Sequence, residues 1–144
     1  MPIPDRIERT LELAHPVERV WDALTSAEGL GGWFGTSAEV DLRPGGEAVV
    51  SWDENNRARL RIQVVDPPHR FAWSWGIDGL PEGDPRQTYV EFTLQPTAAG
   101  TRLHVVESGF AQLPDELLDR AYRGNQDGWT RELGELVSYL DAAA

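Results

Sequence analysis

Two polar residues lie at positions where the sequence predicts an apolar interior. The segment Thr101 to Gly109 alternates, and the register that buries Leu103 and Val105 also turns Glu107 inward. Asn125 lies in the middle of an apolar helical stripe, and Gly128 leaves a notch in the same helix beside the bulky Trp129. An apolar pocket uses a few such groups as hydrogen-bonding anchors, and we expect Glu107 and Asn125 to be these anchors. Each of these features also has an ordinary structural explanation. An arginine or a water molecule donates hydrogen bonds to Glu107, Asn125 bonds to nearby backbone, and Gly128 allows close packing.

Large aromatic side chains occur on most of the elements predicted to surround these two residues. Together they suit the wall of an apolar pocket, although any one of them can equally be core. With Glu107 and Asn125, the predicted lining is Trp33, Phe34, Trp52, Phe71, Trp73, Trp75, Phe110, Tyr122 and Trp129.

Established catalytic and metal-binding patterns are missing from the sequence. His15 and His69 adjoin prolines and are expected to be solvated, while His104 lies three residues from Glu107 and so on the opposite face of its strand. The glycines at positions 29, 31 and 32 do not match a dinucleotide-binding loop, and no Gly-x-Ser-x-Gly elbow is present. We therefore predict no catalytic residue, no metal site and no cofactor.

The composition limits the classes of partner. The 144 residues carry a net charge of −11, which disfavours nucleic acid and anionic membranes. There is no cysteine, and the N-terminus lacks the basic and apolar regions of a signal peptide. One strand face carries a basic stripe of Arg57, Arg59 and Arg61. We expect this face to be solvated and paired with neighbouring acids, and the alternative is that it binds an acidic partner. We expect one cytoplasmic domain spanning residues 1–144.

The order of the elements predicts an α+β fold. A first strand, Arg6 to Ala14, is followed by a short helix opened by Pro16 and by a weak helical segment, Ala27 to Phe34. The chain from Ser37 to Gly109 then reads as strands joined by hairpins, with a loop at Asp78 to Arg86. The final segment, Pro114 to Leu140, is a long amphipathic helix. Hairpins make an antiparallel sheet, and this helix must cover its apolar face.

Several short motifs resemble one known family. The segment Pro16-Val-Glu-Arg-Val-Trp-Asp-Ala-Leu-Thr25, followed by Trp33-Phe34, resembles the opening of the START-like (SRPBCC, helix-grip) superfamily. Val40 to Gly46, Val65 to Pro68, Gly100 to Leu103 and Gly128-Trp129 narrow the resemblance to the family of activator of heat-shock-protein-90 ATPase homologue 1-like proteins. This resemblance implies a curved antiparallel sheet of about six to seven strands around the C-terminal helix, with two short helices after the first strand and a cavity between sheet and helix.

The resemblance leaves several functions open, because relatives include lipid carriers, hormone receptors, polyketide cyclases and co-chaperone domains. We favour binding of a small hydrophobic molecule in the cavity, without catalysis. The alternatives are a polyketide cyclase- or aromatase-like enzyme and a stress-related chaperone-interacting module. A chaperone partner is not expected, because the chain lacks the extra N-terminal domain of the eukaryotic co-chaperone. A homodimer remains open.

Overall fold

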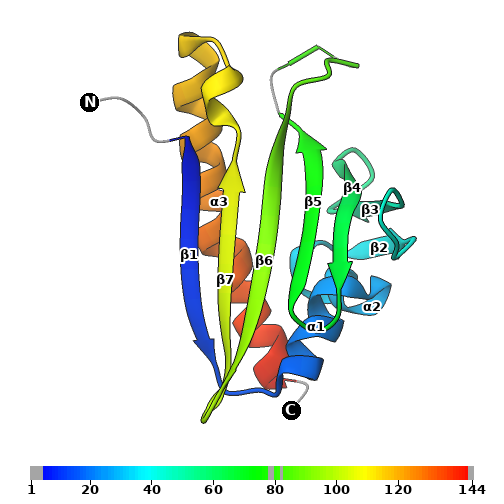
Figure 1. Cartoon of the computed structure of the whole chain (residues 1–144). Helices are drawn as coiled ribbons and strands as arrows, with labels where there is room; N and C mark the ends of the chain where they lie inside the picture. Colours follow the sequence, from blue (N-terminus) through cyan, green and yellow to red (C-terminus); the bar gives the residue numbers. More distant parts are fainter. Residues whose placement is uncertain (1–4, 78–79, 82, 143–144) are drawn as a thin grey trace.

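A computed structural model describes residues 5–77, 80–81 and 83–142 (Figure 1). Its elements, in chain order, are β1 (Arg6–Leu13), α1 (Val17–Thr25), α2 (Ala27–Gly29), the π-helical turn η1 (Leu30–Phe34), β2 (Ser37–Val40), β3 (Glu47–Ser51), β4 (Arg57–Asp66), β5 (Arg70–Gly76), β6 (Gln87–Thr97), β7 (Gly100–Ser108), the 3₁₀ turn η2 (Phe110–Gln112) and α3 (Asp115–Ala142). Parts of the predicted N-terminal segment and of the Asp78 to Arg86 loop lie outside the described residues.

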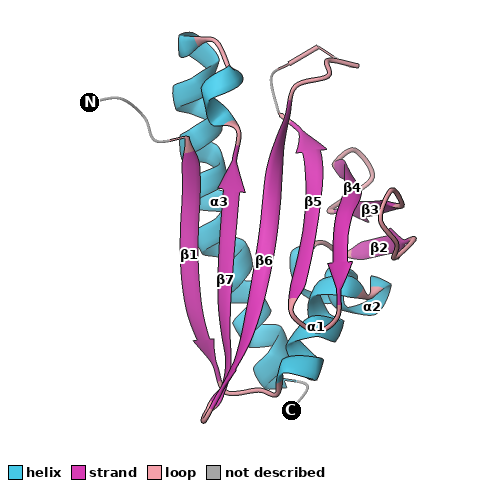
Figure 2. Cartoon of the chain, viewed as in Figure 1, coloured by secondary structure: helices cyan, strands magenta, loops and turns pink. Residues whose placement is uncertain are grey.

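The seven strands form one antiparallel sheet in the order β1-β7-β6-β5-β4-β3-β2 (Figure 2). Each strand from β2 to β6 pairs with the next one along the chain, and β1 adds to the far edge beside β7. The long helix α3 runs behind β1, β7 and β6, and α1 lies near its C-terminal end (Figure 1). This arrangement confirms the predicted α+β helix-grip fold.

The weak helical segment after α1 is divided into α2 and the π-helical turn η1. Glycine allows this close packing: a Cβ at Gly29 would lie 2.5 Å from the carbonyl oxygen of Ala23, and one at Gly32 would overlap the ring of Tyr139. The turn η1 therefore fits tightly between α1 and α3. It delivers Trp33 and Phe34, both buried, into the space under the sheet.

The predicted register of β7 is confirmed. Leu103, Val105 and Glu107 are buried, whereas Arg102 is exposed and His104 is half-buried, with its ring 3.1 Å from a carboxylate oxygen of Glu8 on the outer face. Alternation along β7 thus places an acid at the end of the apolar row, opposite the face that carries the histidine.

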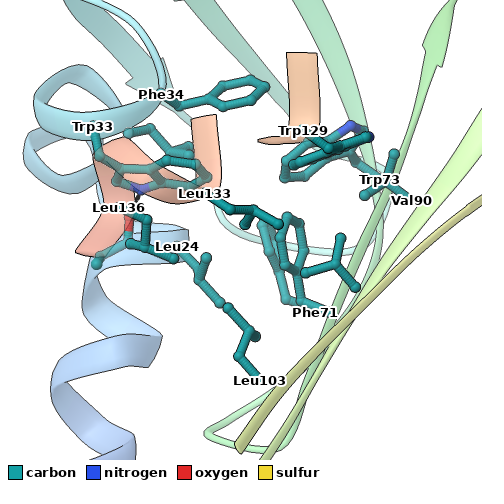
Figure 3. Packing of buried hydrophobic residues seen from close by; sticks show 14 of the residues in the cluster. Leu24, Trp33, Phe34, Phe71, Trp73, Val90, Leu103, Trp129, Leu133 and Leu136 are labelled. Carbon is teal, nitrogen blue, oxygen red and sulfur yellow. Dashed lines mark hydrogen bonds between the residues drawn. The ribbon is translucent and has the colours of Figure 1, made fainter. Parts of the chain in front are cut away.

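The apolar stripe of α3 is covered unevenly. Its C-terminal half carries Leu133, Leu136 and Leu140, all buried, and Figure 3 shows the first two packed with side chains from α1, η1 and the sheet. Further towards the N-terminus, Ala121 and Asn125 are only half-buried. The helix is therefore packed most closely along its C-terminal half, with Leu117 buried near its N-terminus, and it leaves space beside its middle.

The prediction that His15 is solvated is wrong. Its side chain is buried, with 8% exposed, and its Nε2 lies 2.8 Å from Oδ1 of Asp141. The C-terminal turn of α3 extends past Leu140 and covers this histidine at the junction of β1 and α1. No helix in the described part of the chain is long and apolar enough to cross a membrane.

A candidate ligand pocket between sheet and helix

A pocket of about 410 Å³ opens beside the middle of α3. Its apolar wall consists of Phe34, Trp75, Ala121 and Trp129, and its polar wall consists of Asn125, Arg120, Arg131 and Glu132. A neighbouring pocket of about 480 Å³ shares Trp75, Ala121, Asn125 and Arg131 and adds Trp52, Ala58 and Ile77. Trp75 and Asn125 thus stand between two adjoining spaces.

Glycines on α3 create part of this space. Gly124 and Gly128 lie one helical turn apart and both line the first pocket. A Cβ built on either residue would have no atom within 4 Å. The predicted notch at Gly128 is therefore open on the pocket side, because no neighbouring side chain has moved in to fill it.

Glu107 lies beneath this wall and joins four side chains. It is 1% exposed. Its Oε2 accepts hydrogen bonds from Trp75 Nε1 at 2.7 Å and Thr88 Oγ1 at 2.5 Å, and its Oε1 accepts one from Trp129 Nε1 at 2.9 Å. The amide of Asn125 donates to both oxygens at 3.0 Å. Every partner in this set is a neutral donor, so the predicted alternative of an arginine partner is wrong.

The sheet register explains why these groups meet. Trp75 of β5 pairs directly with Thr88 of β6, and Glu107 of β7 pairs with Val90, two residues further along β6 on the same face. Three adjacent strands therefore point Trp75, Thr88 and Glu107 to one side of the sheet. From the opposite side, α3 contributes Asn125 and Trp129, four residues apart on one helical face.

A carboxylate offers about four acceptor positions, and the neighbouring side chains occupy those of Glu107. Glu107 is also not among the residues that line either pocket. Its role in the structure is to orient Trp75, Trp129 and Asn125, which do line the pocket. Of the two predicted anchors, Asn125 lines both pockets and Glu107 lines neither, and the anchoring of a ligand stays a prediction.

The predicted aromatic residues divide into three groups. Phe34, Trp52, Trp75 and Trp129 line one or both pockets. Phe34 is central among them, with ring centroids 5.2 Å from Trp52 and 5.9 Å from both Trp75 and Trp129.

The second group is buried core behind that wall. Trp33, Phe71 and Trp73 are each at most 1% exposed, and none of them lines the two pockets. Trp33 donates from Nε1 to the carbonyl of Ala23 at 2.7 Å, and Phe71 and Trp73 pack against one another at 5.7 Å between ring centroids (Figure 3). These residues support the pocket wall from behind.

Phe110 and Tyr122 form the third group, a separate edge-to-face pair with centroids 5.3 Å apart. The hydroxyl of Tyr122 donates to the carbonyl of Arg6 at 3.2 Å. This contact turns Tyr122 towards β1, so the structure places the pair outside the walls of both pockets.

Sequence reasoning missed the charged residues of the pocket, above all Glu132. Glu132 is only 6% exposed, and its Oε1 lies 3.3 Å from Nε of Arg131. Its Oε2 is buried without a hydrogen-bond partner. Burial raises the pKa of Glu132, the hydrogen bond from Arg131 opposes this shift, and the charge of Glu135 adds to it. The helical spacing carried the signal, since Glu132 follows Trp129 by three residues and precedes Leu136 by four.

The arrangement suits binding of an apolar molecule more than metal chemistry. Within residues 5–77, 80–81 and 83–142, no three His, Cys, Asp or Glu side chains gather closely enough to hold a metal ion. The first pocket combines three aromatic rings, one amide and a few charged groups, and its volume falls in the range typical of small-molecule sites.

The fold and pocket define a helix-grip protein with an aromatic-walled cavity. Residues 14–141 match the family described as activator of Hsp90 ATPase homolog 1-like protein, and the chain belongs to this family. No curated protein matches the sequence.

Three solved structures illustrate the similarity. Protein MLL2253 from Mesorhizobium loti is 26% identical, with a TM-score of 0.81 over 96% of this chain and 98% of that one. DynU16, described as a putative protein in the dynemicin biosynthetic locus, is 23% identical, with a TM-score of 0.79 over 98% of this chain and 49% of that one. The Aha1 dimer from Colwellia psychrerythraea is 17% identical, with a TM-score of 0.76 over 94% and 95% of the two chains. The last two show the shared fold alone.

Proposed function

We propose that this protein binds a small hydrophobic molecule in the pocket between α3 and the sheet. The observation that carries the proposal is the pocket itself, whose aromatic wall of Phe34, Trp75 and Trp129 faces the open notch at Gly128. Burying a ligand against these rings would remove apolar surface of both from water, at about 25 cal/mol per Å².

The hydrogen bonds beneath the wall favour binding further. Both indole N–H groups, of Trp75 and Trp129, are held by the same buried carboxylate of Glu107. Their rings are therefore oriented before a ligand arrives. A preorganised wall loses little side-chain freedom on binding, and this reduces the cost that binding must overcome.

Ligand titration tests the proposal. A panel of flat hydrophobic compounds (flavonoids, polyketides and fatty acids) is titrated while tryptophan emission and melting temperature are followed. A ligand at a hundred times its Kd should stabilise the protein by about 2.7 kcal/mol. The proposal fails if no compound in the panel changes either signal.

Two glycine variants on the same helix locate the site. Gly128→Phe should fill the first pocket and abolish the response to any compound found. Gly134→Phe is the matched control, because Gly134 is also a helical glycine at which an added Cβ would meet no atom within 4 Å, but it does not line the pocket. Equal binding by both variants would place the ligand elsewhere.

A polyketide cyclase- or aromatase-like enzyme is the second candidate. The observation in its favour is Glu132, a buried acid in the pocket wall whose pKa is raised by burial, the direction in which enzymes tune a carboxyl group that acts as a general acid or base. Compounds that bind should then be incubated with the protein and analysed by chromatography for products. If the compounds are recovered unchanged, the cyclase function is rejected and binding without catalysis remains as the proposal. A homodimer stays a prediction, which sedimentation would check.

A further inference from the structure

The carboxyl group of Glu132 is incompletely satisfied inside the pocket wall. Its side chain is 8% exposed, and its partner Arg131 lies in a largely exposed position, with 68% of its side chain accessible. The contact uses only Oε1 and spans 3.3 Å, while Oε2 is buried without a partner. A buried acceptor left without a donor is destabilising, because it has lost its hydrogen bonds to water and gained none in return. A bound molecule that supplied a donor would recover this cost.

The charges around the pocket limit what that molecule can be. Arg120 and Arg131 line the same pocket as Glu132. A cationic ligand would be repelled by the two arginines, and an anionic ligand would have to approach the buried carboxylate. A neutral donor avoids both penalties. The remaining wall of Phe34, Trp75 and Trp129 calls for an apolar, preferably aromatic, body.

We infer that Glu132 is the specificity-determining residue of this pocket, and that it selects neutral aromatic molecules whose hydroxyl group donates a hydrogen bond to its carboxyl group. This inference rests on the proposed binding function and adds the chemical class of the ligand. Burial raises the pKa of Glu132 because the apolar surroundings disfavour its charged form, and a donor from the ligand would offset this cost by stabilising the charged form.

The experiment compares two probes of nearly the same shape. In 2-naphthol a hydroxyl occupies the position that a methyl group occupies in 2-methylnaphthalene. Equilibrium dialysis at pH 7 gives the Kd of each probe, and the ratio of the two constants reports the contribution of the hydroxyl. The ratio is measured for the wild type, Glu132→Leu and the control Glu135→Leu, in which an exposed acid on the same helix is replaced.

Glu132→Leu should reduce the preference for 2-naphthol by about tenfold, because a hydrogen bond to a charged group is lost. Glu135→Leu removes only a charge that acts on Glu132 and no acceptor of the pocket, so it should change the ratio far less than Glu132→Leu. Glu132→Gln retains one acceptor oxygen and should give an intermediate ratio. It takes the place of Glu132→Leu in the test if the leucine variant does not fold. A ratio unchanged in the Glu132 variants, with both probes bound, would overturn this inference and leave the binding function standing. If neither probe binds the wild type, the inference fails, while the binding function is decided by the titration of the compound panel.

Discussion

Replacing Glu107 by glutamine tests how far the pocket wall depends on one buried carboxylate. Glutamine has nearly the same shape but only one acceptor oxygen, and its amide donates. In either orientation, an N–H of the new side chain faces one of the two indole N–H groups, that of Trp75 or that of Trp129. One charge-assisted hydrogen bond, worth about 1.5–3 kcal/mol, is then lost, and the remaining ones become weaker.

Burying the neutral glutamine costs less free energy than burying the charged carboxylate, and this difference offsets part of the loss. We therefore expect Glu107→Gln to reduce the free energy of unfolding by about 2–4 kcal/mol, a typical range for breaking a buried polar network. For a chain of this length that corresponds to a decrease in melting temperature of roughly 10 °C.

Urea unfolding followed by tryptophan emission measures this difference. Glu12→Gln is the control, because Glu12 is exposed and its ion pair with Arg102 lies on the surface, where such pairs contribute about 0–1 kcal/mol. A loss in Glu107→Gln no larger than that of the control would refute the reasoning. It would mean that the carboxylate contributes no more than its neutral analogue and that the rings are held by packing alone.

Three further changes have expected outcomes. Trp129→Ala should destabilise the protein by about 3–5 kcal/mol in urea unfolding, because the ring is 3% exposed and also donates to Glu107; a loss below about 1 kcal/mol would contradict its place in the core. Gly128→Ala should stabilise by about 0.5–1 kcal/mol, since alanine favours the helix and its Cβ meets no atom within 4 Å; a lower melting temperature would show that the notch is filled. The pKa of Glu132 is raised because the folded protein disfavours its charged form. The free energy of unfolding therefore decreases as the pH rises above the ordinary pKa of 4.5 and through the folded-state pKa. Glu132→Gln should accordingly gain more stability at pH 8 than at pH 4, and equal gains at both would argue against the shift.

Much of the fold was predictable because its signals are local. Alternation along β7 placed Glu107 inward with Leu103 and Val105, and the helical stripe of α3 contained Asn125. Both patterns depend only on the periodicity of a strand or a helix. The antiparallel sheet followed from the hairpins, and the apolar stripe of the long helix indicated that this helix covers the sheet.

The division of the aromatic residues could not be predicted in the same way. Trp73 and Trp75 are two residues apart and point to the same face of β5, yet Trp73 belongs to the core and Trp75 lines the pocket. The difference arises from what covers each ring, because Phe71 and Phe92 pack against Trp73, whereas Trp75 lies beside the open space at the middle of α3. Alternation assigns a face of the sheet, but the position of the covering helix decides which part of that face is filled.

The amino-acid sequence by itself determined which residues point inward: the acid at position 107, the amide at 125 and the tryptophans at 75 and 129. Only the tertiary structure decided that these four side chains meet, because they come from β7, α3 and β5 and are separated by 18 to 32 residues from Glu107 along the chain. It also decided that Glu107 is occupied by its neighbours while Glu132 keeps a free acceptor oxygen. Periodicity assigns a direction to each side chain, whereas its hydrogen-bond partners depend on how sheet twist and helix placement bring distant segments together.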